Sequence, residues 1–355
     1  MNPTFIILGI LAFGVIIAIH ELGHYLAAKS LNVKVNEFAI GMGPKLLKKQ
    51  GKETLYTLRA LPFGGFCAME GEHEEGENPD PRSFLSQKRW KRIVILASGS
   101  IANIVAAFII ILILTAGSEG FVGTTLTEVV DKFPEIGQSE LMPGDRILRL
   151  NGERLFYYDD FVLFRQLNTG KPVTLTVDRS GEIFEYERRS YIVDGEEQFR
   201  YNLRFEIIDN NILETLKYSG YQTYSFIRMI RLSLAMIFSG TAGMQDLAGP
   251  VGIVSTMNTI GQQTSAVHGV AAAIGSIIFF MAFIGVNVAV LNLLPIPAMD
   301  GGRILFIFIT WIIEKFTRKN LDPKYEGYIN TGAFVLLIGL MVIVLYNDVM
   351  KIIGW

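Results

Sequence analysis

Cysteine is nearly absent from this chain, because Cys67 is the only one in 355 residues. A single cysteine excludes an intramolecular disulfide, and Cys67 is expected to be a buried small hydrophobe. Charge is also scarce: charged residues make up 19% of the chain, and the formal net charge is −2. This balance gives no indication that nucleic acid is a partner. Histidine occurs only four times, so any metal site has few imidazoles to draw on.

Apolar sequence, in contrast, is abundant: 50% of the residues are hydrophobic and the mean hydropathy is +0.36. These values are typical of a membrane protein. Four apolar runs are long enough to cross a bilayer. They cover residues 5–28, 93–117, 270–294 and 329–346. No basic residues precede the first run and no small-residue cleavage site follows it, so we expect this run to remain as a span.

Two shorter apolar segments are not expected to cross the membrane alone. Residues 304–313 are too few to span it and are predicted to continue the third segment beyond a break. Residues 226–238 carry Arg228 and Arg231 and are predicted to form a helix at the membrane interface.

The first span contains the pentapeptide His20-Glu21-Leu22-Gly23-His24. On a helix, positions i and i+4 share a face, so both imidazoles can bind one ion, while the glutamate, about 100° around the helix, reaches its bound water. Ionisable groups are costly inside a span and are therefore candidates for function. The alternative is a pair of packed structural histidines. The intervening glutamate favours a metal site with Glu21 as the catalytic residue.

The third span ends in a second unusual segment, residues 292–303. Pro295 and Pro297 break the helix, and Asp300 is left at membrane depth before two glycines. A catalytic zinc ion takes three protein ligands and keeps one position open, so Asp300 is predicted to be the third ligand beside His20 and His24. The alternative is that Asp300 only caps the helix that follows.

The combination of an intramembrane HExxH with a distant N-x-x-P-x-P-x-x-D-G resembles the site-2 protease family of intramembrane zinc metalloproteases. Four further passages match, at residues 41–44, 61–66, 98–103 and 248–252. The resemblance is closest to the bacterial branch that includes the regulator of sigma-E protease, in particular its members with a single PDZ domain. Met299 replaces the more usual leucine, and Arg303 stands where some relatives carry histidine.

These residues predict metal-assisted peptide hydrolysis with one catalytic Zn²⁺, in which Glu21 takes a proton from the attacking water and returns it to the leaving amine. The resemblance implies that the substrates are single-span membrane proteins already shortened outside the membrane, such as anti-sigma factors or remnant signal peptides. The candidate substrate-binding residues are Asn292, Asn287, Pro295, Gly65 and Phe66. For the two asparagines, the alternative is packing between helices.

The loop between the first two spans has strand-like content at residues 35–40, 53–61 and 64–69. It is predicted to form a β-hairpin loop, and the resemblance implies that this loop dips into the membrane near the zinc. Its edge could pair with an extended substrate. The alternative is an ordinary soluble hairpin. The acidic run at residues 70–80 is interpreted as a solvated loop, with cation binding as the alternative.

A PDZ-like domain of α+β type is predicted between the second and third spans. Its predicted elements are a turn and strand at residues 141–152, a short helix at 159–166 and an alternating strand at 173–177. The segment 133–137 is a poor match to the usual carboxylate-binding loop. Peptide binding and a passive size filter therefore remain equally open.

Four parts follow along the chain. Residues 1–117 are expected to form the first half of the membrane core, 118–212 the PDZ-like domain, 213–268 an interfacial helix with a linker, and 269–355 the second half. Lys and Arg concentrate between the first two spans and after the third, which predicts that these loops are cytoplasmic. Both termini and the PDZ-like domain would then be extracytoplasmic. The resemblance to the bacterial branch implies that the membrane is the cytoplasmic membrane of a bacterium.

The predicted fold is thus a polytopic α-helical membrane protein with about four transmembrane helices, a membrane-associated β-hairpin loop and one inserted PDZ-like domain. Its expected partners are the lipid bilayer, single-span protein substrates and a peptide ligand of the PDZ-like domain. A metal transporter or a catalytically silent scaffold is the alternative. Transport is disfavoured by the single metal constellation and the lack of an obvious inverted repeat, and a scaffold would not need Glu21.

Overall fold

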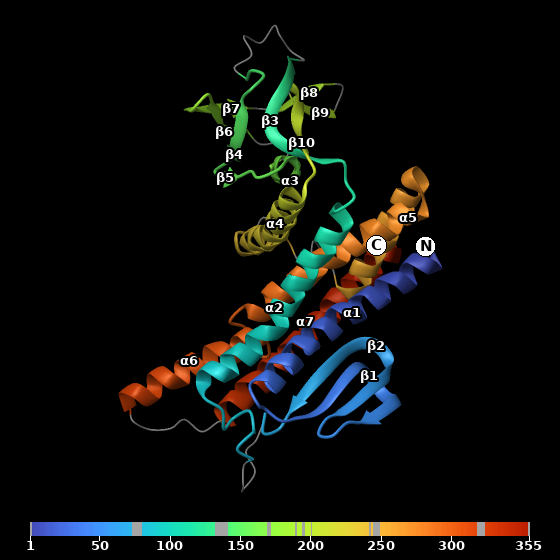
Figure 1. Cartoon of the computed structure of the whole chain (residues 1–355), viewed down its shortest axis with the longest axis vertical. Coiled ribbons are helices and arrows are strands. Elements are labelled where there is room, and N and C mark those ends of the chain that lie inside the picture. The colour runs from blue at the N-terminus through green and yellow to red at the C-terminus, as the bar shows by residue number, and fades with distance from the viewer. Residues whose placement is uncertain are drawn as a thin grey trace. The chain divides into compact units, whose positions relative to one another are not determined.

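The structure is a computed structural model that forms two compact units (Figure 1). The membrane unit comprises Met1–Ile111 and Phe226–Trp355, and the inserted unit comprises Leu112–Ser225. The structure describes residues 2–72, 80–131, 141–168, 172–188, 190–193, 196–199, 201–240, 243, 249–317 and 324–353.

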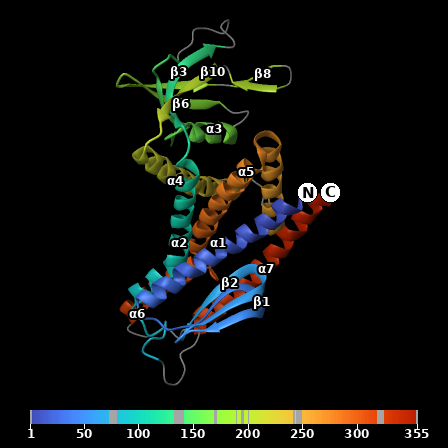
Figure 2. The same ribbon diagram turned by 45° about the vertical axis from the view of Figure 1, so that its right-hand side comes forward.

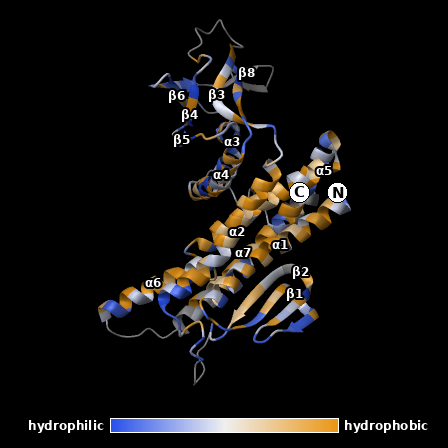
Figure 3. Ribbon diagram, viewed as in Figure 1, coloured by the Kyte–Doolittle hydropathy of each residue, from blue (hydrophilic) through white to orange (hydrophobic). Residues whose placement is uncertain are grey.

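Four helices in the described parts of the chain are long and apolar enough to cross a membrane, as predicted. They are α1 (Pro3–Ser30), α2 (Arg89–Thr115), α5 (Pro250–Leu293) and α7 (Lys324–Ile353). In Figure 3 their ribbons are mostly hydrophobic in colour. The chain is therefore a multi-pass membrane protein with an inserted β-rich region.

Helix α1 begins sharply and continues without interruption through the HExxH motif. The side chain of Asn2 accepts a hydrogen bond from the Thr4 amide, and Pro3 occupies a first-turn position, where its missing N–H costs nothing. Its buried residues recur every three or four positions and so form one face. They are Phe5, Gly9, Ala12, Ile16, His20, Gly23, His24 and Ala28. Both histidines therefore point into the protein, not toward lipid.

Helix α5 is longer than the predicted third span. It starts at Pro250, within the segment expected to be a linker, and it is interrupted at Gly269, which has a left-handed φ of 84°. The predicted break after the third span is confirmed, because the chain leaves α5 at Leu293 and begins α6 (Asp300–Thr317) a few residues later. Helix α4 (Ile212–Phe238) contains the expected interfacial segment; its position at the membrane interface stays a prediction.

The loop between α1 and α2 forms a hairpin of two long strands, β1 (Val35–Gln50) and β2 (Leu55–Met69). The register shows that both strands fold back. Residues 37–40 lie opposite 65–68 and also opposite 55–58, and the end of β1 lies opposite 55–59. Four short segments are therefore side by side, in the order 65–69, 35–40, 55–59 and 45–50. Both Figures 1 and 2 place this hairpin beside α1. The segment 65–69 forms one outer edge.

The inserted unit is built on an antiparallel sheet with the strand order β10-β3-β4-β6-β7, and β5 pairs with β4. Its elements are β3 (Gly120–Asp131), β4 (Arg146–Leu150), β5 (Glu153–Arg154), α3 (Tyr158–Leu167), β6 (Val173–Arg179), β7 (Glu182–Arg188), β8 (Ser190–Val193), β9 (Glu196–Phe199) and β10 (Tyr201–Asp209). The predicted helix and strand match α3 and β6. The segment 133–137 lies outside the described residues, as does part of the motif at 248–252.

Candidate metal centre

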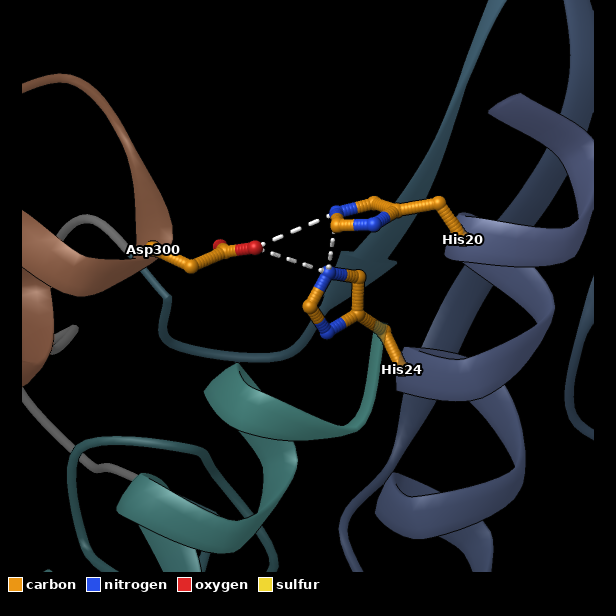
Figure 4. A group of neighbouring side chains, drawn as sticks. All are labelled: His20, His24 and Asp300. Atoms are coloured by element: carbon orange, nitrogen blue, oxygen red, sulfur yellow. Dashed lines mark hydrogen bonds and ion pairs between the residues drawn. The ribbon is translucent and has the colours of Figure 1, made fainter. Parts of the chain in front are cut away.

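Three side chains from opposite ends of the sequence converge in the membrane unit (Figure 4). Oδ2 of Asp300 lies 3.1 Å from Nε2 of His20 and 3.3 Å from Nε2 of His24. The two Nε2 atoms are themselves 3.1 Å apart. The potential ligand atoms of the three residues all lie within 4.8 Å of one another. The structure thus brings together the three residues that the sequence predicted as metal ligands.

The histidine pair is oriented by α1 and by the backbone of α2. The spacing of four residues stacks His20 and His24 on the buried face of α1, with their rings nearly perpendicular, at 85°. Nδ1 of His24 lies 2.8 Å from the carbonyl oxygen of Ile95. A carbonyl can only accept a hydrogen bond, so Nδ1 carries the proton and the lone pair of Nε2 points toward Asp300. Such a contact is the usual way in which a ligand imidazole is fixed.

Asp300 is placed by the break between α5 and α6. The chain turns tightly there: Ala298 has a left-handed φ of 71°. A β-carbon on Gly301 would lie 2.2 Å from the carbonyl oxygen of Leu294, and one on Gly302 would lie 2.2 Å from that of Ile296. Only glycine fits these two positions, which explains the Asp-Gly-Gly sequence. Asp300 is the first residue of α6, but its carboxylate faces the histidines, so capping alone does not account for it.

A cavity of about 710 Å³ opens beside this group. It is lined by Glu21 together with the three convergent residues, by residues 66–69 of β2, and by parts of α2, α5 and α6. Glu21 also approaches the hairpin, since a β-carbon on Gly65 would lie 3.4 Å from its Cγ. The cavity therefore lies between the three converging side chains, the Glu21 carboxylate and the edge of β2.

The other predicted site residues have different outcomes. Asn292 lines the cavity, with Nδ2 3.4 Å from Nε2 of His20, and Phe66 also lines it. Gly65 lies next to Glu21, as described above. Asn287 instead donates a hydrogen bond of 3.1 Å to the Phe283 carbonyl within α5. Pro295 belongs to the break and is not among the residues that line the cavity.

Two charged residues at the cavity were not predicted as site residues. Arg303 donates a hydrogen bond of 2.7 Å to Oε1 of Glu72, and both side chains line the cavity. Arg303 follows Asp300 by three positions and therefore shares its helix face, a spacing that could have identified it. Glu72 lies in the run that the sequence indicated as a solvated loop. For Glu72 this interpretation is wrong, because its side chain is only 15% exposed.

The convergent group fits a zinc ion. Two imidazole nitrogens and one carboxylate oxygen are ligands that zinc prefers, and three protein ligands beside an open cavity are typical of a catalytic site. The electrostatics agree, because the lone pair of His24 Nε2 and the carboxylate of Asp300 would repel unless a cation or proton lay between them. His20, His24 and Asp300 would hold the zinc.

The protein is a helical membrane protein in which a buried HExxH helix meets a distant aspartate at a site that fits zinc. These features define the class of intramembrane zinc metalloproteases. Residues 8–340 match the model of peptidase family M50, and the chain belongs to this family. It is a membrane zinc metalloprotease.

Bacterial relatives match over nearly their whole length. A Clostridium acetobutylicum protein named as a candidate zinc metalloprotease is 37% identical over 349 residues, which is 97% of each chain. A Clostridium perfringens protein with the same type of name is 36% identical, over 97% of this chain and 98% of its own. Zinc metalloprotease RasP of Geobacillus kaustophilus is 26% identical, over 96% of this chain and 97% of its own.

Proposed function

We propose that this protease cleaves peptide bonds in or near the transmembrane segment of single-span membrane proteins that have already been shortened outside the membrane. The observation that carries the proposal is the position of the site. His20, Glu21 and His24 lie within a membrane-spanning helix, and they open onto a cavity bordered by a sheet edge. A site within a membrane span is accessible to substrate segments that are themselves in the membrane, and much less accessible to a soluble protein.

Glu21 is the proposed catalytic residue. When bound, zinc polarises the scissile carbonyl and makes water more acidic. Glu21 faces the same cavity as the ligands, so it can take the proton from the attacking water and return it to the amine of the leaving segment. Its position next to His20 in sequence, about 100° around the helix, keeps its carboxylate out of the ligand set.

The edge of β2 is the proposed platform for the substrate. A peptide bond inside a helix is shielded, so the substrate must be extended where it is cut. Residues 65–69 pair with 35–40 on one side, and their other side borders the cavity. An extended substrate can add there as a further strand, held by backbone hydrogen bonds. Asn292 and Phe66 are positioned to contact it.

The inserted unit is proposed to be a PDZ-like domain on the extracytoplasmic side. Its antiparallel sheet with α3 is compatible with a PDZ-like domain. The Lys- and Arg-rich hairpin loop before α2 favours the cytoplasmic side, so the unit that follows α2 is expected on the extracytoplasmic side. Such a domain could bind a peptide, or it could exclude substrates that still carry bulky external domains. Anti-sigma factors and remnant signal peptides are the proposed substrate types.

The test is cleavage of a panel of externally truncated single-span proteins in liposomes by wild type and Glu21→Gln, with bound zinc measured in both. We expect cleavage by wild type alone and equal zinc contents. Full cleavage by Glu21→Gln would exclude the proposed role of this residue. Zinc in both proteins without cleavage by wild type would favour a scaffold, and zinc uptake into the liposomes would favour a transporter.

A further inference from the structure

We propose that Glu72, held in place by Arg303, closes one end of the substrate-pairing edge of β2 and thereby determines which peptide bond is cut. This inference rests on the proposed function, because it assumes that an extended substrate pairs with this edge. Glu72 would be a positioning residue, since it acts on the register of the substrate and not on the reacting atoms.

The direction of the backbone amides at the end of β2 is the first observation. The Glu70 amide donates to the Lys34 carbonyl oxygen at 2.9 Å, so it points toward the β1 side of the sheet. Successive amides along a strand alternate in direction, which means that the Met69 amide points outward. That amide donates to Oε2 of Glu72 at 3.3 Å. Glu72 thus occupies a donor on the edge that an added strand would use.

The turn that follows β2 brings the carboxylate back to this amide. Gly71 has a left-handed φ of 58°, and a β-carbon there would lie 2.7 Å from Cβ of Ser83. Both the conformation and the lack of space require glycine. The chain therefore reverses immediately after the strand, and Glu72 folds over its end.

Arg303 holds the carboxylate in this position from the other wall of the cavity. Its guanidinium binds Oε1 at 2.7 Å, while Oε2 accepts from Met69, so the two oxygens are used by two different elements. The Arg303 and Glu72 side chains are only 17% and 15% exposed. The guanidinium also lies 5.2 Å from the centre of the Phe84 ring. Separating a pair this buried would leave charges poorly solvated, so the contact is expected to persist when substrate binds.

The consequence is a stop for strand addition. An incoming strand can use the outward-facing backbone of Cys67, but the next outward amide, at Met69, is already bonded. An inward charge at a strand end is a known way to block edge pairing. Because side chains and hydrogen bonds repeat every two residues along a strand, the next acceptable register differs by two residues. Without Glu72, the substrate could slide by that step, and the bond next to Glu21 would change.

The experiment compares cleavage positions, read from the masses of both fragments of one single-span substrate, for wild type, Glu72→Ala, Glu72→Gln and Glu70→Gln. We expect one main bond for wild type, and additional products displaced by two residues for Glu72→Ala. Glu72→Gln keeps an oxygen acceptor and should shift cleavage less. Glu70→Gln is the matched control, because Glu70 pairs with Lys34 at 3.1 Å on the far side of the strand, and its products should be unchanged.

Register can also be read without turnover. In a Glu21→Gln background, Phe66→p-benzoylphenylalanine places a photo-crosslinker on the edge, and the crosslinked substrate residue should move by two positions when Glu72→Ala is added. If Glu72→Ala cleaves the same bond more slowly and the crosslinked residue does not move, the proposed role of Glu72 is wrong, while the proposed function is unaffected. If wild type cleaves nothing in the panel, the proposed function itself fails, and the two failures are thereby distinguished.

Discussion

Gly99 of α2 lies against His24 of α1 so closely that a β-carbon at position 99 would stand 2.5 Å from the Nε2 atom of the imidazole. The same β-carbon would lie 2.8 Å from Nε2 of His20. Gly23 makes the reciprocal approach, since its β-carbon would lie 2.4 Å from the Ser98 carbonyl oxygen. The metal ligands therefore have their geometry because two glycines let α1 and α2 touch.

Gly99→Ala should displace the imidazoles of His20 and His24 from the position in which their Nε2 atoms converge with Asp300. We expect the zinc affinity and the cleavage rate to fall by at least about tenfold, because small displacements of ligands and of their supporting groups have effects of that size. Bound zinc per protein and cleavage of a single-span substrate measure this. Gly275→Ala, in α5, is the matched control, since nothing lies within 4 Å of its β-carbon position. Equal zinc affinity in Gly99→Ala and wild type would contradict the argument.

Asp300→Asn should remove the charge that completes the ligand set. An amide is a far poorer zinc ligand than a carboxylate, so we expect loss of bound zinc and of cleavage together. Asp348→Asn serves as a comparison, because Asp348 is also a buried carboxylate of the membrane unit, at 2% exposure, but does not line the cavity. Retention of stoichiometric zinc by Asp300→Asn would exclude Asp300 as a ligand.

Asp348 itself supports the start of α5. Its carboxylate accepts hydrogen bonds from the amides of Gly249, at 3.2 Å, and Gly252, at 2.8 Å, and so satisfies donors that a helix start leaves open. Asp348→Ala should lower the free energy of unfolding by about 1–3 kcal/mol, the cost of leaving buried donors unpaired. Thermal unfolding in detergent measures this, with zinc content as the control that should not change. An unaltered Tm would show that water replaces the carboxylate.

Glu37 of β1 gives the hairpin a dependence on pH. Burial raises the pKa of Glu37, but hydrogen bonds from Arg59, Thr57 and Lys45 outweigh it and lower the pKa from 4.5 to about 2. The stabilisation is therefore complete above pH 4.5 and is lost as pH falls toward 2. Glu37→Gln should reduce Tm at pH 7 and have a smaller effect at pH 3. Glu128→Gln, which removes an exposed ion pair with Arg204, should change Tm little at either pH.

Local patterns made much of the metal centre predictable. The spacing of His20 and His24 fixes their common face once a helix is assumed. The prolines and glycines around Asp300 predict a helix break at this carboxylate. The apolar runs likewise identify the four spans. In each case the information lies within one turn or one segment, where helix geometry and bilayer thickness decide the outcome.

The parts that sequence reasoning missed depend on contacts between distant segments. Glu72 and Arg303 are 231 positions apart, and nothing in either local sequence indicates the ion pair. Asn287 was predicted as a substrate-binding residue, and its Nδ2 donates to the Phe283 carbonyl of its own helix; its contact with substrate stays a prediction. The fold-back of β1 and β2 was also hidden, because short strand-like segments do not specify their neighbours. The start of α5 was also missed, because the prediction followed the apolar run from residue 270, whereas the helix begins at Pro250 and continues on both sides of the left-handed Gly269.

The separation between His20 and Asp300 in the sequence also determines when the metal site can form during synthesis of the chain. These residues are 280 positions apart, and a chain grows from its amino terminus. At typical rates of about 5–20 residues per second, on the order of tens of seconds pass between the synthesis of the first ligand and the last. During that interval the HExxH helix can be in the membrane, but it has no third ligand. A newly made chain is thus proteolytically inert until the segment after α5 has been made and has reached α1.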